Sequence, residues 1–294
     1  MQAASQETPV PPISQSSLDL FSAHLLSSNK ILALLGAGLS VPSNISAFRG
    51  STDVFRGCDM SMLSSNSMFR DDPVLTWWYH VHRREQVLRA KPNIAHYALS
   101  KLGDCKIEYL AITQNIDGLS EKAGHKASCL QPIHGSILNF KCSAPNCPYT
   151  LLHKDQSEML GQSIVIPPNI DLANANVPLP TTNLPHCPDC NSFLRPDITW
   201  FGEELNAEYL HRIDKFIAQG PVDLMLVVGT QASVHPAASY ILKARKAGAR
   251  IAYVDIKPWC EDKAPLGDRD FFFQGDAVDV VPMILRDVIG EVKC

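Results

Sequence analysis

The sequence predicts an α/β fold: a parallel sheet with helices on both faces, interrupted by a helical insertion and by a small metal-binding module. Three observations support this prediction. The apolar runs Ile31–Leu35 and Leu224–Val228 have the length of strands that are buried on both faces of a sheet. Strand-like and helical segments alternate in the second half of the chain, as they do around parallel sheets. Residues 142–190 contain four cysteines but too few apolar residues for a core of their own.

The predicted elements can be placed in chain order. The first residues are rich in Pro, Ser and Gln, which is typical of a flexible tail. Two insertions then divide the sheet domain, which is Rossmann-like in its alternation of strands and helices. The predicted order is a tail at 1–17, a helix at 18–28, a strand at 30–35, the helical part of a small domain at 51–105, a strand at 107–113, the metal-binding module at 142–190, strands at 197–201, 223–229 and 250–255, and a helix at 237–247. The Rossmann-like domain comprises residues 18–50, 106–141 and 191–294.

Composition excludes several classes of protein. Of the 294 residues, 45% are apolar and 19% are charged, as in an ordinary folded chain, and the net charge is only −4. We therefore expect no direct binding to nucleic acid and no attraction to an anionic membrane. No apolar run approaches the roughly 20 residues that span a bilayer. Nine cysteines without a signal-peptide pattern indicate a reducing, intracellular compartment, and the absence of Arg from the N-terminal tail favours the cytoplasm or nucleus over the mitochondrion.

A glycine-rich turn directly follows the first buried strand. Residues 36–40, Gly-Ala-Gly-Leu-Ser, would let the backbone approach a phosphate closely, and a helix beginning there would offer free N–H groups. The third glycine of the usual dinucleotide fingerprint is replaced by Val41, so the motif alone also suits a turn that binds nothing. Further on, Phe48 would cover a flat ring and Arg49 would meet a phosphate, or else Phe48 lies in the core and Arg49 in solvent.

Polar groups follow other predicted strands at their carboxyl ends, where open α/β sheets bind ligands. Residues 113–117, Thr-Gln-Asn-Ile-Asp, offer amides and a carboxylate that suit a carboxamide or ribose hydroxyls. The alternative is a polar loop in which Asp117 caps a helix. Residues 229–231, Gly-Thr-Gln, offer a second backbone cradle, and Asp255 ends a later strand where it would hold ribose hydroxyls or simply start a turn.

His134 stands beside Gly135 at the expected edge of a strand or loop. An imidazole there suits a general base, because its pKa lies naturally near neutrality. The chain has ten histidines, however, so most of them must be structural.

Two closely spaced cysteine pairs indicate a metal site. Four residues separate the members of the first pair and two separate those of the second, which matches a tetrahedral zinc site with four thiolate ligands. Such a site has no open coordination position, so the ion would be structural and would supply folding free energy that the thin core lacks. His153 and His186 are alternative ligands. The pairs are Cys142 with Cys147 and Cys187 with Cys190.

The order of these motifs is similar to that of the sirtuins, which are NAD-dependent protein lysine deacylases. The similarity extends over residues 30–285, and the run His-Val-His-Arg-Arg-Glu at 80–85 most resembles the class III branch. The motifs are GAGLSVPSNISAFRG at 36–50, TQNID at 113–117, IHGS at 133–136, the paired cysteines, WFGE at 200–203 and GTQASVHPA at 229–237.

The resemblance implies an enzyme that transfers an acyl group from lysine to NAD-derived ADP-ribose and releases nicotinamide, with one structural zinc ion. His134 would be the general base, and Asp117 would read the carboxamide of NAD. Acyl-lysine proteins or peptides would bind as an added strand between two loops. The implied NAD contacts are Gly36, Ala37, Gly38, Ser40, Phe48, Arg49, Gln114, Asn115, Ile116, Asp117, Gly229, Thr230, Gln231, Asp255, Lys257 and Ala277. The implied peptide contacts are Phe201, Gly202, Glu203 and Val234.

Several positions depart from the family pattern. Asn44 replaces a glycine, and asparagine tolerates left-handed backbone angles better than most residues. Gln231 stands where serine is common, and Asp255 and Lys257 replace an asparagine and a carboxylate that lie near the adenosine ribose.

The acyl pocket departs most from the class III pattern, Tyr-x-x-Arg, which recognises acidic acyl groups. His80 occupies the tyrosine position, and Tyr79 lies four residues before Arg83. Both spacings place a residue on the same helix face as Arg83. Either Tyr79 or a protonated His80 would thus join Arg83 in binding a malonyl, succinyl or glutaryl group. The alternative is an acetyl or longer apolar acyl substrate, with Arg83 as a surface charge.

Two other functions fit parts of the same pattern. Transfer of ADP-ribose from NAD to a protein would use the same pocket with a different acceptor. A non-catalytic NAD-sensing interaction protein would need the pocket only, and the presence of both His134 and Asn115 argues against it. The sequence leaves the oligomeric state and the protein targets open.

Overall fold

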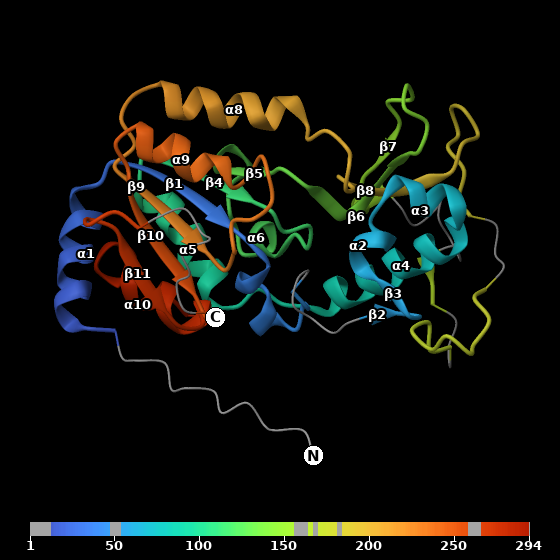
Figure 1. The fold of residues 1–294 in the computed structure, drawn as a ribbon, viewed down its shortest axis with the longest axis horizontal. Coiled ribbons are helices and arrows are strands. Elements are labelled where there is room, and N and C mark those ends of the chain that lie inside the picture. Colours follow the sequence, from blue (N-terminus) through green and yellow to red (C-terminus); the bar gives the residue numbers. More distant parts are fainter. Residues whose placement is uncertain are drawn as a thin grey trace, which may run out of the picture.

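The computed structural model describes residues 13–47, 54–155, 164–166, 170–180, 184–257 and 266–293. A large domain contains one six-stranded sheet, in which every pair of neighbours is parallel, and a smaller domain lies beside it (Figure 1). Its strands, in spatial order, are β11 (Phe271–Gln274), β10 (Arg250–Asp255), β9 (Leu224–Val228), β1 (Lys30–Leu35), β4 (Glu108–Thr113) and β5 (Leu130–Pro132). The predicted α/β fold is confirmed.

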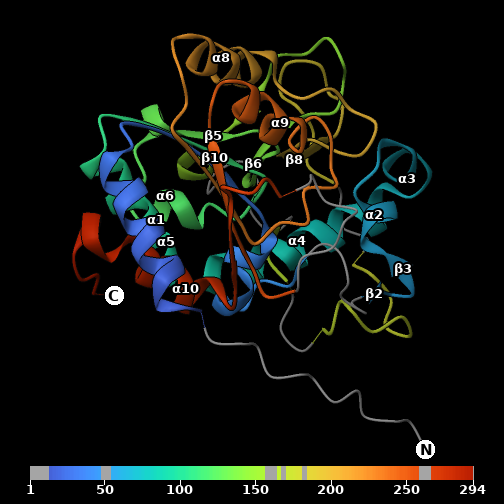
Figure 2. The same cartoon turned by 60° about the vertical axis from the view of Figure 1, so that its left-hand side comes forward.

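Helices cover one face of this sheet, where alternate apolar residues of the strands pack against them. Ile31, Ala33 and Leu35 of β1 belong to the same hydrophobic cluster as apolar side chains of three helices. These helices lie on the same side of the sheet in both views (Figures 1 and 2). They are α1 (Gln15–Ser27), α5 (Ile94–Cys105) and α10 (Ala277–Ile289).

The other face is covered by α8 (Ala207–Ala218) and α9 (Ser239–Lys246). Leu32 and Leu34 of β1 pack there with Ile213 of α8 and with apolar residues of α9. Since β1 faces helices on both sides, all six of its residues are buried, which explains its continuous apolar sequence.

The smaller domain combines the helical insertion with the cysteine module. Trp77 and Trp78 of the insertion share a hydrophobic cluster with Phe140 and Leu194 of a three-stranded antiparallel sheet. The insertion contains β2 (Val54–Phe55), β3 (Cys58–Asp59), α2 (Met60–Leu63), α3 (Asn66–Asp71) and α4 (Pro73–Arg89), and the sheet contains β7 (Thr150–Leu151), β6 (Gly135–Cys142) and β8 (Leu194–Ile198), with β6 in the middle.

Short helical turns complete the description. The helix α6 (Leu119–Lys122) follows β4, and 3-10 turns lie at Ala37–Leu39, Val41–Ser43, Ala127–Cys129 and His153–Asp155. In the part of the chain that the structure describes, no helix is long and apolar enough to cross a bilayer.

The predicted domain boundaries need correction in two places. The helix α5 belongs to the large domain rather than to the helical insertion, because Ala95, Leu99 and Leu102 pack into the sheet's core cluster. The strand expected at 197–201 is β8, which begins earlier and pairs antiparallel with β6 in the smaller domain instead of joining the parallel sheet.

The side chain of Arg56 ties the β2–β3 hairpin to the cysteine module. Its guanidinium donates hydrogen bonds to the backbone carbonyls of Leu172, Asn174, Ala175 and Val177 over 2.7–3.2 Å. A planar guanidinium with several N–H donors suits such a row of carbonyl acceptors. The hairpin and the loop at 172–177 are therefore joined by four hydrogen bonds from one side chain, in addition to the apolar cluster that contains Phe55 and Leu172.

Candidate functional site

A cavity of about 730 Å³ lies at the carboxyl ends of β1, β4 and β9, between the two domains. Strand order reverses around β1 here, and this is where open α/β sheets bind ligands. Both groups of predicted contacts meet in its wall. The lining residues include the predicted base His134, with Ala37, Gly38, Ser40, Gln114, Asn115, Ile116, Asp117, Gly229, Thr230, Gln231, Asp255, Lys257 and Ala277 of the predicted NAD contacts, and Arg83, Phe201, Gly202, Glu203 and Val234 of the predicted substrate contacts.

Some predicted contacts lie elsewhere. Gly36 is buried beneath the cavity and is not part of its wall. Tyr79 and His80 are buried in the smaller domain, at 3% and 2% exposure, and neither lines the cavity. Phe48 and Arg49 lie outside the described residues.

The glycines of the first motif allow two loops to pack together. A Cβ on Gly36 would lie 2.5 Å from Cβ of Thr230, and a Cβ on Gly38 would lie 2.8 Å from Cα of Gly229. The glycines are thus required by the loop after β9, in addition to any contact with a ligand. The expected helix start consists of two 3-10 turns, and Asn44 ends them with left-handed angles, φ 63° and ψ 31°, as its residue type predicts.

Ser40 is the centre of a polar group on the cavity floor. The side-chain nitrogen Nδ2 of Asn115 donates to Ser40 Oγ at 3.2 Å and to the carbonyl oxygen of Gly36 at 3.0 Å. Asp117 accepts a hydrogen bond from the N–H of Leu119 at 2.9 Å, but the N-cap position of α6 is Gly118, so Asp117 is not the helix cap that the alternative interpretation expected. Burial raises the pKa of Asp117, and a hydrogen bond from Ser40 acts against that shift.

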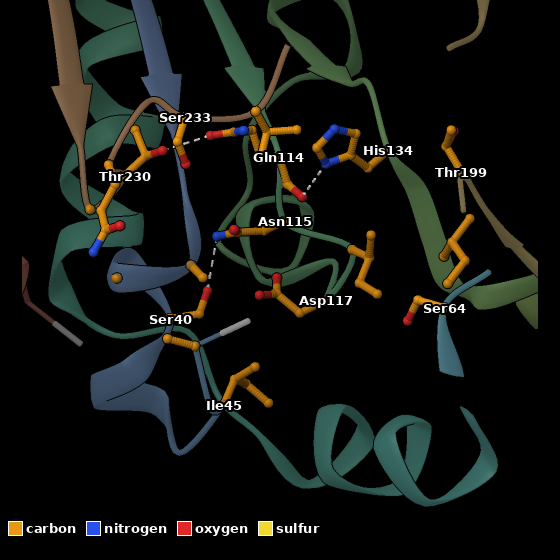
Figure 3. Close-up of a pocket in the computed structure, with 18 of the residues that line it drawn as sticks. Ser40, Ile45, Ser64, Gln114, Asn115, Asp117, His134, Thr199, Thr230 and Ser233 are labelled. Atoms are coloured by element: carbon orange, nitrogen blue, oxygen red, sulfur yellow. Dashed lines mark hydrogen bonds between the residues drawn. The ribbon is translucent and has the colours of Figure 1, made fainter. Parts of the chain in front are cut away.

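Gln114 connects the loop after β9 to the imidazole of His134. Figure 3 shows Gln114 between Thr230 on one side and His134 on the other. Its side-chain oxygen accepts from the hydroxyl of Thr230, and its backbone carbonyl lies 2.9 Å from Nδ1 of His134. A carbonyl only accepts, so Nδ1 carries the proton and Nε2 is the basic nitrogen. Burial lowers the pKa of His134, which keeps the ring neutral at pH 7.

The predicted acyl-pocket residues are separated by the fold. Nδ1 of His80 lies 2.7 Å from the carbonyl of Thr76, and burial lowers the pKa of His80 to about 4. Nδ1 carries the proton that this bond to a carbonyl needs, so Nε2 of the neutral ring offers only a lone pair, which a carboxylate does not bind. Since the ring also lies outside the cavity wall, the prediction for His80 needs correction. Arg83 does line the cavity, where its guanidinium donates to Gln86 Oε1 and to the carbonyl of Ser46.

The four module cysteines meet as predicted. Their sulfur atoms all lie within 4.8 Å of one another, with Cys142 and Cys190 3.4 Å apart and Cys147 and Cys187 3.7 Å apart. Sulfurs bound about 2.3 Å from a tetrahedral zinc ion are about 3.8 Å apart, so the cluster fits one structural zinc ion. His153 is not needed as a ligand, since its Nδ1 lies 3.1 Å from the guanidinium of Arg84.

Sequence reasoning missed part of the wall. Ser46, Ala47, Thr199 and His235 line the cavity, and so does Asp276 before α10. Asp276 accepts from the N–H of Val278 and begins the helix. An Asp directly before an apolar helical pattern is a helix-start signal that could have revealed this part of the site.

A parallel sheet that opens such a cavity at its switch point is the architecture of dinucleotide-binding α/β enzymes. Comparison with known proteins identifies the family. The Sir2 family model matches residues 36–236, and the chain belongs to the Sir2 family.

Relatives and solved structures agree with this assignment. The chain is 36% identical to a protein of Candida albicans named NAD-dependent protein deacylase, over 92% of this chain and 98% of that protein. It is 34% identical to a protein of the same name from Pyrococcus abyssi, over 90% and 95%. A crystal structure of a Sir2 homolog–NAD complex superposes with a TM-score of 0.73 and 27% identity, covering 96% of each chain.

Proposed function

We propose that this chain is an NAD-dependent protein-lysine deacylase, which moves an acyl group from lysine to ADP-ribose and releases nicotinamide. The observation that carries the proposal is the neutral imidazole of His134, held by Gln114 in the wall of a cavity of about 730 Å³. Membership of the Sir2 family and relatives named as deacylases support it.

The residues of the cavity fit NAD in two groups. The polar floor formed by Ser40, Asn115 and Asp117 would hold the nicotinamide end, because a buried carboxylate and amide pair with a carboxamide and with hydroxyls. The loop at 229–231, with Asp255, Lys257 and Ala277, would hold the adenosine end. When bound, NAD supplies the electrophilic ribose carbon and the hydroxyls that accept the acyl group.

His134 would act as the base. Its Nε2 would take a proton from a ribose hydroxyl, while Nδ1–H keeps its bond to the Gln114 carbonyl and stabilises the imidazolium. The backbone of His134 is fixed as well, since its carbonyl accepts from the N–H of Thr199 at 2.9 Å. The zinc ion takes no part in the reaction, because four thiolates would fill its coordination sphere.

Uncharged acyl groups are the better substrates on this proposal. Arg83 alone of the three predicted acyl-pocket residues lines the cavity, and Gln86 and Ser46 already accept hydrogen bonds from its guanidinium. Near it the wall is apolar, with Ile45, Val87, Ile116, Ile137 and Ile198. An acidic acyl group would have to draw Arg83 away from both acceptors.

An acyl-peptide panel tests the proposal. Acetyl-, crotonyl-, malonyl-, succinyl-, glutaryl- and myristoyl-lysine peptides are incubated with the protein, with and without NAD, and are followed by mass spectrometry. We expect NAD-dependent loss of the acetyl group with formation of O-acetyl-ADP-ribose. A higher kcat/KM for succinyl than for acetyl peptide would refute the acyl preference, and unchanged peptides throughout would refute deacylation.

A second assay addresses the alternative activity. A Sir2 structure with a deacetylated p53 peptide and an acetyl-ADP-ribose superposes with a TM-score of 0.72 at 26% identity, which supports a peptide as the source of the acyl group. With radiolabelled NAD, label should appear in free O-acyl-ADP-ribose. Label retained on protein would instead indicate ADP-ribosyl transfer.

A further inference from the structure

The segment 199–203 joins the two domains along one side of the cavity. The N–H of Thr199 donates to the carbonyl of His134, and the N–H of Phe201 donates to the carbonyl of Ser64 in the smaller domain, at 2.9 and 3.0 Å. Phe201, Gly202 and Glu203 all line the cavity. The backbone of this segment is therefore bonded to His134 through Thr199 and to the smaller domain through Phe201.

A buried ion pair lies directly behind the segment. Arg195 Nη2 is 2.5 Å from Oε1 of Glu203, and the two side chains are only 7% and 15% exposed. The guanidinium also lies 3.9 Å from the centre of the Trp200 ring. Charge-assisted hydrogen bonds of this length are among the stronger ones in proteins.

Both carboxylate oxygens of Glu203 are engaged. Oε2 accepts from the N–H of Trp200 at 2.9 Å, and Oε1 accepts from Asn66 Nδ2 at 2.8 Å in addition to Arg195. Burial opposes ionisation of Glu203, but the bonds from Arg195 and Trp200 outweigh it and lower its pKa. The carboxylate thus links β8, α3 and the turn at 200–203.

We propose that the Arg195–Glu203 pair is a positioning device that sets the conformation of residues 200–203 for the acyl-lysine peptide. Glu203 was predicted to contact the peptide, but its carboxylate is occupied within the protein, so its side chain acts through the backbone of Trp200 and Phe201. This inference rests on the proposed function, because it assigns the segment to peptide binding.

The expected effect is on peptide binding rather than on NAD. The segment follows β8 of the smaller sheet, whereas the loop at 229–231 and the adenosine end follow strands of the large sheet. Glu203→Gln removes the charge, and Arg195→Met removes its partner, while each keeps a similar side-chain volume. If the pair served only to stabilise the core, its loss would instead raise the KM for both substrates together. Alternatively, it would lower the melting temperature without a selective change in the KM for the peptide.

Steady-state kinetics with NAD and an acetyl-lysine peptide test the proposal. We expect Glu203→Gln and Arg195→Met to raise the KM for the peptide about ten-fold, with kcat and the KM for NAD changed less than about two-fold. Arg195→Lys should restore part of the loss, since it keeps the charge with fewer aligned donors. Asp197→Asn is the matched control, because it removes a neighbouring charge on β8 that pairs with Lys141.

Hydrogen–deuterium exchange of the segment 199–205 gives a readout that does not depend on turnover. We expect its amides to exchange about ten-fold faster in Glu203→Gln than in the wild type or in Asp197→Asn. An unchanged peptide KM, an equal rise in both KM values, or unchanged exchange would overturn the positioning role. If the wild type shows no deacylation, the proposed function and the peptide role of the segment fail together, and the exchange result then decides only whether the pair fixes the conformation of the segment.

Asn66→Ala provides a milder test in case Glu203→Gln or Arg195→Met fails to fold. Asn66→Ala removes only the third partner of the carboxylate, from the exposed side of the pair. We expect a smaller rise in peptide KM and a smaller increase in exchange, both in the same direction. No change in either quantity would count against the proposal.

Discussion

The imidazole of His134 and the backbone carbonyl of Gln114 form a 2.9 Å hydrogen bond, which fixes the proton on Nδ1. Because burial lowers the pKa of His134, the basic form persists below the ordinary value of 6.5. We predict that kcat/KM is constant from pH 8 to 7 and falls on the acid side with a midpoint below 6.5. An acid limb centred above 6.5 would contradict this, and circular dichroism at each pH distinguishes loss of the base from unfolding.

Replacing the base separates chemistry from binding. His134→Ala should lower turnover by about 10³-fold, within the range for a general base, while the Kd for NAD changes only a few-fold. Product formation and calorimetric titration with NAD measure the two quantities. His211→Ala, an exposed histidine on α8, is the matched control and should behave as wild type. Near-normal deacylation by His134→Ala would remove His134 from its role.

Three buried histidines should make the protein acid-sensitive. Burial lowers the pKa values of His80, His96 and His125 to about 4. Between pH 6.5 and 4 the unfolded chain binds more protons, so stability falls as the pH falls, by roughly 1.4 kcal/mol per pH unit for each histidine. Urea unfolding from pH 7 to 5 measures the slope. His96→Gln should make it shallower, and an unchanged slope in that variant would contradict the prediction.

The packing of the two glycine-containing loops predicts a steric effect. Gly36→Ala would place a Cβ 2.5 Å from Cβ of Thr230 and 2.7 Å from the carbonyl oxygen of Gly229. One loop must shift, and overpacking of this kind typically costs about 1–3 kcal/mol. We expect a lower melting temperature together with weaker NAD binding. A variant with wild-type values for both would show that the two loops are not closely packed.

The cysteine cluster predicts that metal loss unfolds the smaller domain. Cys142→Ser and Cys187→Ser should lower the bound zinc to less than one ion per chain and expose the module to limited proteolysis. Metal analysis and protease digestion check this. Cys105→Ser is the control, since Cys105 is exposed and lies outside the cluster. A metal-free protein that keeps its protease resistance would argue against a structural ion.

The sequence predicted those features of the structure that depend on neighbouring residues in the chain. The run at 30–35 is apolar throughout because β1 is covered on both faces, and Asn44 supplies the left-handed angles that its side chain tolerates. The spacing of the cysteines identified the metal module. Local motifs also predicted where the ligand cavity lies. Gln114 follows β4 and Thr230 follows β9, and these two strands flank the central strand β1.

Other features depend on which element packs against which. The helix α4 is buried on most sides, so the spacing of Tyr79, His80 and Arg83 could not tell which of them faces the cavity. The helical pattern at 51–105 did not separate α5 from the insertion, because that depends on the packing of α5 in the core cluster of the sheet with α1 and α10. The partners of Glu203 come from β8 and α3, which are separated from it along the chain, and no local pattern indicates them.

The clamp made by Arg56 differs in kind from the ion pairs elsewhere in the chain. Its four acceptors are peptide carbonyls, which do not titrate, and a guanidinium keeps its charge at any pH at which proteins fold. The tether between the hairpin and the loop at 172–177 should therefore survive acidification that protonates the buried histidines. During acid denaturation we expect the packing around the buried histidines to be lost first, while the hydrogen bonds between Arg56 and the loop at 172–177 persist.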